Sequence, residues 1–91
     1  MIYGFVLATR YPDRDRASIE SVLANIAGVK EVYRTSGIYD MVIKIEAADA
    51  ASLRRAAREI KAIDGIQFAV TNVVYDAEYG IRPPTRSATA A

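Results

Sequence analysis

The sequence repeats one joint, in which an apolar helical pattern ends at a glycine and an apolar run follows at once. The first joint is Asn25-Ile26-Ala27-Gly28-Val29, and the second is Ala62-Ile63-Asp64-Gly65-Ile66. Glycine favours the position directly after the last turn of a helix. The repeat therefore indicates two similar halves, each with a helix between two strands.

The rest of the pattern fills in these halves. Residues 2–9 are apolar at both odd and even positions, which is typical of a central strand with both faces covered. Further strands are expected over residues 29–35, 39–46 and 66–76. Asp13 or Asp15 can cap the first helix and Asp49 the second. Apolar residues at helical spacing follow each cap: Ile19, Val22, Leu23 and Ile26, then Leu53, Ala56, Ala57 and Ile60.

This order predicts an α+β fold, the ferredoxin-like βαββαβ plait, with a four-stranded antiparallel sheet and both helices on one face. The other face of the sheet would remain bare, although the first and last strands are apolar on both parities. Leaving such a face in water is costly, and the hydrophobic fraction of 52% is high for 91 residues. We therefore expect a homodimer that forms through the sheet, a dimeric α/β barrel.

The composition removes several classes of function. The chain has no Cys and no His, so it lacks a thiolate nucleophile, the commonest general base and the commonest metal ligand. We assign no catalytic residue, no metal site and no cofactor. The net charge of +1 gives no general attraction to nucleic acid or membranes. Without a signal peptide or a membrane-spanning run, the sequence predicts a cytoplasmic protein.

The segment 34–40 is the main candidate for a binding site. Gly37 fits a residue of positive φ in a hairpin, and its bare backbone could also approach a ligand. Asp40 either caps the turn or pairs with the ammonium group of a ligand, since a half-buried carboxylate needs a partner. Tyr39 either packs or turns its hydroxyl toward a cleft, and Ser36 either supports the turn or donates a hydrogen bond to a ligand.

Two further polar groups stand out. Thr71 and Asn72 interrupt the apolar final strand, which their residue types explain by a place near a sheet edge or on a solvated face. The second helix carries a basic face that is expected to be solvated, because nucleic-acid binding would need interleaved aromatic residues or a larger positive excess. This face consists of Arg54, Arg55, Arg58 and Lys61.

The ordered set of motifs resembles the effector domain of the Lrp/AsnC transcriptional regulators, the RAM domain, over roughly residues 1–78. It includes 28–32, Thr35-Ser36-Gly37-Ile38-Tyr39-Asp40, 64–66 and 71–74. Residues 79–91 are expected to be a flexible C-terminal tail. Because the chain starts in the first strand, it resembles a stand-alone form that lacks the helix-turn-helix domain of these regulators.

The resemblance implies dimers joined through their sheets, which assemble further, often as four dimers in a ring. It implies an amino acid or related effector in clefts between dimers, lined by the hairpin and the last strand. The expected ligand-binding residues are Ser36, Gly37, Tyr39, Asp40, Thr71 and Asn72. Such a domain would modulate transcriptional regulation of amino-acid metabolism without binding DNA directly, with full-length Lrp/AsnC regulators as further partners by mixed assembly.

Two other functions fit the same fold. One is a small dimeric-barrel enzyme of the monooxygenase or isomerase type, with Tyr39 and Asp40 as acid and base. The lack of His and Cys counts against it. The other is an oligomerisation module that binds no ligand. Ligand screening separates the sensor from the module, and only turnover would support the enzyme.

Overall fold

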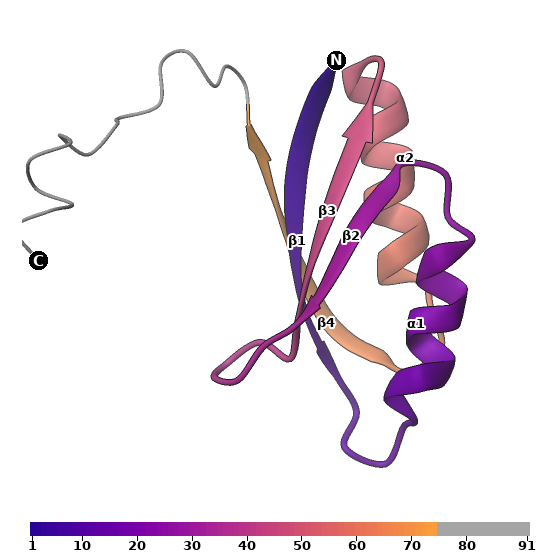
Figure 1. The fold of residues 1–91 in the computed structure, drawn as a ribbon, viewed down its shortest axis with the longest axis vertical. Coiled ribbons are helices and arrows are strands. Elements are labelled where there is room, and N and C mark those ends of the chain that lie inside the picture. The colour runs from indigo at the N-terminus through magenta and orange to yellow at the C-terminus, as the bar shows by residue number, and fades with distance from the viewer. Residues whose placement is uncertain (75–91) are drawn as a thin grey trace, which may run out of the picture.

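The computed structural model describes residues 1–74, and they form the predicted plait. The elements are β1 (Ile2–Arg10), α1 (Arg16–Ala24), β2 (Val29–Arg34), β3 (Met41–Ala47), α2 (Ala50–Lys61) and β4 (Ile66–Val74). The sheet order is β2-β3-β1-β4, and each neighbouring pair is antiparallel. Both helices lie on the same side of the sheet (Figure 1). The predicted fold class and element order are therefore confirmed.

Two strand boundaries around the hairpin differ from the predicted ones. β2 ends at Arg34, and β3 begins at Met41 rather than at residue 39. The reason is that Tyr39 and Asp40 belong to the turn, where the Thr35 N–H donates to the Asp40 carbonyl at 2.8 Å. The predicted end of the last strand at residue 76, the domain boundary at 78 and the tail 79–91 lie outside the described residues.

The core lies between the helices and the sheet face that they cover. Along β1, Val6 pairs with Ile43 and Ala8 pairs with Met41, and all four side chains are fully buried. The helices complete this layer with Ile19 and Leu23 of α1 and with Leu53, Ala56 and Ile60 of α2. The apolar alternation in the central strands therefore places one parity in a closed core.

The two helices follow their predicted stripes unequally. In α2 the stripe residues Leu53, Ala56 and Ile60 are buried, and Ala57 is half-buried. Asp49 caps the first turn because its carboxylate accepts from the Ser52 N–H at 2.8 Å. This hydrogen bond lowers the pKa of Asp49. In α1 only Ile19 and Leu23 are buried, whereas Val22 is 46% exposed. The short α1 contacts the sheet along one i, i+4 line, and Val22 lies outside that line.

The other sheet face is not covered by residues 1–74 of the same chain. Tyr3, Phe5 and Leu7 of β1 are only half-buried there, and Phe68 of β4, which pairs with Thr9, is 53% exposed. The prediction that β1 is covered on both faces is thus met on one face by this chain alone. We call the uncovered surface formed by Tyr3, Phe5, Leu7, Phe68 and Val70 the open sheet face.

A glycine sets the distance between β1 and the edge strand β4. Gly4 is buried and pairs with Val73. A Cβ atom at this position would lie 2.7 Å from the carbonyl oxygen of Asn72, closer than real Cβ contacts allow. The close packing of β4 on β1 at this point depends on the missing side chain.

Candidate functional site

The hairpin between β2 and β3 is held by hydrogen bonds at its base. The Thr35 hydroxyl donates to the Tyr39 carbonyl at 2.6 Å, in addition to the backbone bond from Thr35 to Asp40. The Asp40 N–H donates to the Ala8 carbonyl at 2.9 Å. The Arg10 N–H donates to Oδ2 of Asp40 at 2.8 Å. The hairpin is therefore attached to the end of β1 through one residue, Asp40.

The tip of the hairpin is open. Gly37 has a φ of 129°, a backbone conformation that is nearly restricted to glycine. A Cβ atom there would meet nothing within 4 Å, so conformation and not space requires the glycine. Ser36 is exposed, and Ile38 is 85% exposed. The prediction that Gly37 has positive φ is confirmed.

Within residues 1–74, Oδ2 of Asp40 accepts the N–H of Arg10 at the end of β1 and not an N–H of its own turn, so the carboxylate attaches the hairpin to β1 instead of capping the turn. Its other oxygen, Oδ1, has no hydrogen-bond partner among residues 1–74. A carboxylate has several acceptor positions, so a second donor can bind while the first remains. The contact with Arg10 does not exclude a ligand role for Asp40, which stays a prediction. The ligand roles of Ser36 and of the half-buried Tyr39 also stay predictions.

The two predicted residues of β4 point to opposite faces of the sheet. Thr71 pairs with Val6 and shares its helix-covered face, whereas Asn72 pairs with Phe5 on the open sheet face. Neither lies near the hairpin of the same chain. Phe5 and Arg10 are five residues apart, about 16 Å along a strand. The hairpin and β4 also flank β1 from opposite sides, so one chain alone does not bring all six predicted residues together.

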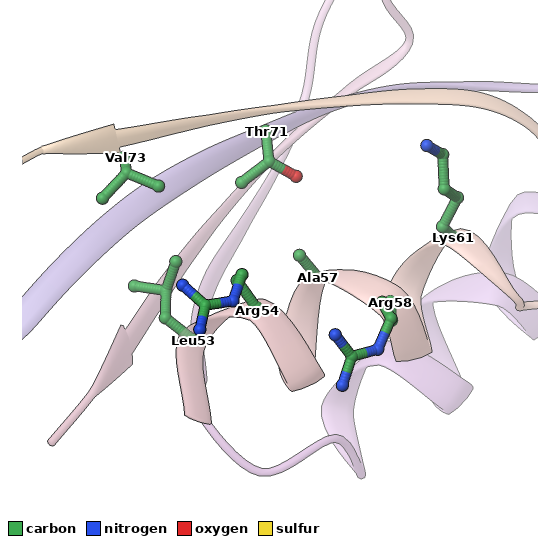
Figure 2. A pocket seen from close by; sticks show the side chains of 7 residues that line it. All are labelled: Leu53, Arg54, Ala57, Arg58, Lys61, Thr71 and Val73. Carbon is green, nitrogen blue, oxygen red and sulfur yellow. The ribbon is translucent and has the colours of Figure 1, made fainter. Parts of the chain in front are cut away.

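A groove lies between α2 and β4, and Figure 2 shows its lining. Its volume is about 280 Å³. It is lined by Leu53, Arg54, Ala57, Arg58, Lys61, Thr71 and Val73. An adjoining hollow of about 220 Å³ near the start of α2 shares Leu53, Arg54 and Val73 with it. We call the first of these the α2–β4 groove.

Sequence reasoning missed this groove. It assigned the basic residues of α2 to a solvated face, and they are indeed exposed, but three of them also line the groove beside Thr71. Two features of the sequence could have indicated the groove. Thr71 is a polar residue at a helix-facing position of a mostly apolar edge strand, and basic residues recur at helical spacing on the helix opposite.

Within the described part of the chain, no group of three or more acidic residues is arranged to hold a metal ion. None of the helices in residues 1–74 is long and apolar enough to cross a membrane.

Comparison with known families gives the same assignment as the fold. The Lrp/AsnC ligand binding domain matches the chain over residues 5–80. The chain belongs to this family. Among solved structures, this chain is similar to E. coli AsnC, with 25% identity and a TM-score of 0.75. The match covers 90% of this chain and 55% of AsnC. It is also similar to TTHA0845 from Thermus thermophilus, with 27% identity, a TM-score of 0.76, and 85% and 96% of the two chains covered.

Two further proteins are similar to this chain over part of their own length. A homocitrate synthase of Sulfurisphaera tokodaii is 40% identical over 52 residues, which are 57% of this chain but only 11% of the enzyme. The chain thus spans about a tenth of that enzyme, and the match shows no catalysis. In fold, the chain also resembles a feast or famine regulatory protein of M. tuberculosis complexed with L-methionine, with 18% identity and a TM-score of 0.70 over 91% of this chain and 56% of that protein.

The family assignment supports a regulatory, effector-binding domain. The matching family is described by ligand binding and not by a reaction.

Proposed function

We propose that this chain is a non-catalytic sensor that binds an amino acid or a related small molecule at the hairpin. It would pass the signal to transcriptional regulation of amino-acid metabolism without binding DNA itself. The family membership supports the effector-binding role. The methionine in the regulatory protein of the same fold makes amino acids the first class of ligand to test.

The proposal rests on two features of the hairpin: a carboxylate with one unbonded oxygen, and backbone N–H groups that donate no hydrogen bond within residues 1–74. Oδ1 of Asp40 is available for an α-ammonium group while Oδ2 stays on Arg10. The N–H groups of Ser36, Gly37 and Ile38 donate no hydrogen bond within residues 1–74, and they suit an α-carboxylate. An amino acid carries both charges, so it complements both parts of the hairpin.

The proposal includes a second copy of the chain. The open sheet face leaves Phe68 53% exposed, on the same face as the half-buried Phe5 and Leu7. Apolar surface of this extent, next to a closed core, favours burial against an equal surface. Because the hairpin and β4 of one chain lie apart, a cleft that contains both would form between dimers, in a higher oligomer such as four dimers in a ring.

Ligand binding is tested by a thermal-shift screen of the twenty amino acids with the wild-type chain and Asp40→Asn. The amide oxygen of Asn can still accept the Arg10 N–H, whereas the charge that would bind an ammonium group is lost. Binding at ten times Kd stabilises by about 1.4 kcal/mol, which raises the melting temperature of a domain of this size by roughly 5–10 °C. We expect this shift with at least one amino acid and its loss in Asp40→Asn.

Asp13→Asn is the matched control, because Asp13 is exposed and its side chain approaches only Arg14, at 4.0 Å. It should keep the full shift. If no amino acid stabilises the wild-type chain, or if Asp40→Asn responds like the wild type, the hairpin is not the amino-acid site.

The dimer is tested by the mass of Leu7→Lys in multi-angle light scattering. Leu7 lies at the middle of the open sheet face, where a lysine would place a charge in the interface. We expect the mass to fall to that of one chain at micromolar concentration. Val22→Lys on the exposed side of α1 introduces the same charge away from the sheet and should keep the wild-type mass. A wild-type chain that is already monomeric would refute the interface.

A further inference from the structure

Among residues 1–74, the side chains that line the α2–β4 groove carry charge of one sign only. Arg54, Arg58 and Lys61 line it, and the lining contains no acidic residue. Glu59, the acid within α2, is not part of the lining. The ion pairs formed among residues 1–74 involve Arg14, Arg34 and Lys44, so none of them neutralises the groove.

Helix electrostatics explain these cations only in part. Arg58 and Lys61 are in the last turn of α2, where positive charge suits the negative end of the helix dipole. Arg54 is in the middle of the helix, where the dipole gives no such benefit. Like charges at i, i+4, as in Arg54 and Arg58, are mildly destabilising. Stability of the helix therefore does not account for the full set.

The groove also has an apolar floor and a polar wall. Leu53 and Ala57 form the floor on α2, and Val73 lies opposite on β4. In Figure 2 the Thr71 hydroxyl points toward α2, and the Lys61 side chain extends toward β4. A rise of 1.5 Å per residue places Arg54 and Arg58 about 6 Å apart along the helix, and Arg54 and Lys61 about 10 Å apart. The positive charges are thus spread along the groove over an apolar surface.

We propose that the α2–β4 groove binds a small organic dianion, a molecule with two acidic groups joined by a short apolar stem. The stem would lie on Ala57 and Val73, one acidic group would bind Arg54, and the other would bind Arg58 or Lys61. The volume of about 280 Å³ suits a metabolite and not a larger ligand. Either carboxylates or a phosphate ester can supply the charges, and arginine binds both through paired hydrogen bonds.

This proposal goes beyond the hairpin sensor and does not depend on it. The groove is on the helix-covered side of β4, whereas Asp40 is at the far end of β1 and on its other side. The two sites predict different ligands and different charged residues, and they share only Thr71 among the residues named for each. A dianion site should be indifferent to Asp40→Asn, which removes the amino-acid response at the hairpin.

The test is isothermal titration calorimetry of the 91-residue chain with glutarate and with glycerol 3-phosphate, and with butyrate as a monoanion of similar stem. We expect one dianion to bind at least tenfold more tightly than butyrate, and the more strongly bound one identifies the acidic group. Arg54→Gln should weaken its binding about tenfold, and Arg54→Gln/Arg58→Gln about a hundredfold. Glutamine keeps the helix propensity of arginine, so these variants should fold.

Arg55→Gln is the matched control. Arg55 is on the same helix and is also exposed, but it does not line the groove. It should bind the dianion within a factor of two of the wild type, as should Asp40→Asn. Equal losses in Arg55→Gln and Arg54→Gln would mean a diffuse positive field and would overturn the site. Loss of dianion binding in Asp40→Asn would mean that the dianion and the amino acid depend on the same residue, and it would overturn the independence of the two sites.

Two further results would also overturn the proposal. One is the absence of binding by either dianion at 10 mM in low salt, where charge interactions are least screened. The other is binding of poly-glutamate with no binding of the small dianions, which would assign the surface to an acidic polypeptide. Circular dichroism of each variant separates loss of binding from loss of fold.

Discussion

The hairpin and the α2–β4 groove both carry polar residues that the sequence singled out, but the chain treats them differently. In the hairpin, the polar groups bind the protein itself. The Thr35 hydroxyl donates to Tyr39, and the Asp40 carboxylate accepts from Arg10. In the groove, Arg54 and Arg58 have no acidic partner within residues 1–74.

The polar groups of the hairpin are therefore needed for folding, whereas the cations of the groove remain available for a ligand. Removal of a polar group that satisfies a half-buried backbone donor costs free energy of folding. Removal of an exposed, unpaired cation does not. The hairpin should therefore be sensitive in stability as well as in binding, and the groove in binding alone. Three substitutions test the contrast.

The largest effect on stability is expected from Asp40→Ala. The variant leaves the Arg10 N–H without its acceptor, which costs about 2 kcal/mol for a half-buried backbone donor. Urea unfolding should show the loss as a lower midpoint with an unchanged slope. Asp40→Asn retains an acceptor and should lose less than half as much. Equal losses in the two variants would mean that charge, and not the hydrogen bond, attaches the hairpin to β1.

A smaller loss is expected from Gly37→Ala. The φ of 129° is unfavourable for any residue with a Cβ, and the strain costs about 1 kcal/mol because the exposed turn can partly relax. The same unfolding measurement applies. Ser36→Ala, in the same turn without positive φ, should stay within about 0.5 kcal/mol of the wild type. An unchanged Gly37→Ala would show that the turn adopts another conformation at no cost.

The smallest effect on stability is expected from Arg54→Gln/Arg58→Gln. Both side chains are exposed, and their removal eliminates a like-charge pair at i, i+4. The free energy of unfolding should change by no more than about 0.5 kcal/mol, with any change toward greater stability. A loss of more than about 1 kcal/mol would show that the groove cations support the fold, and the contrast with the hairpin would fail.

Most of the fold was predictable from residue patterns. Period-2 runs and helical stripes identified all six elements in order, and Asp49 marked the start of α2 through its cap. The errors were local. Asp40 was assigned to a strand because its neighbours are apolar, yet its carbonyl closes the turn with Thr35, and its carboxylate and amide attach the hairpin to β1. Such side-chain to backbone bonds compete with strand pairing and leave no periodic signal.

The candidate site was less predictable, because it depends on which segments are neighbours in space. The hairpin could be found from Gly37 and Asp40 alone. The groove was harder to find, because Thr71 and the spacing of the basic residues of α2 indicate it only once β4 is placed at the sheet edge with α2 over that edge. The sequence placed Thr71 and Asn72 together as ligand contacts, although alternation along a strand directs them to opposite faces.

The close approach at Gly4 has a consequence for natural variation. Any side chain at this position would push against the carbonyl of Asn72, only 2.7 Å from the nearest possible Cβ. The strand that would yield is β4, which has no neighbouring strand on its outer side among residues 1–74. Its movement would displace Thr71 and Val73, the wall of the groove. A mutation of Gly4, which lies outside both proposed sites, would then alter the response to a ligand in a protein that still folds.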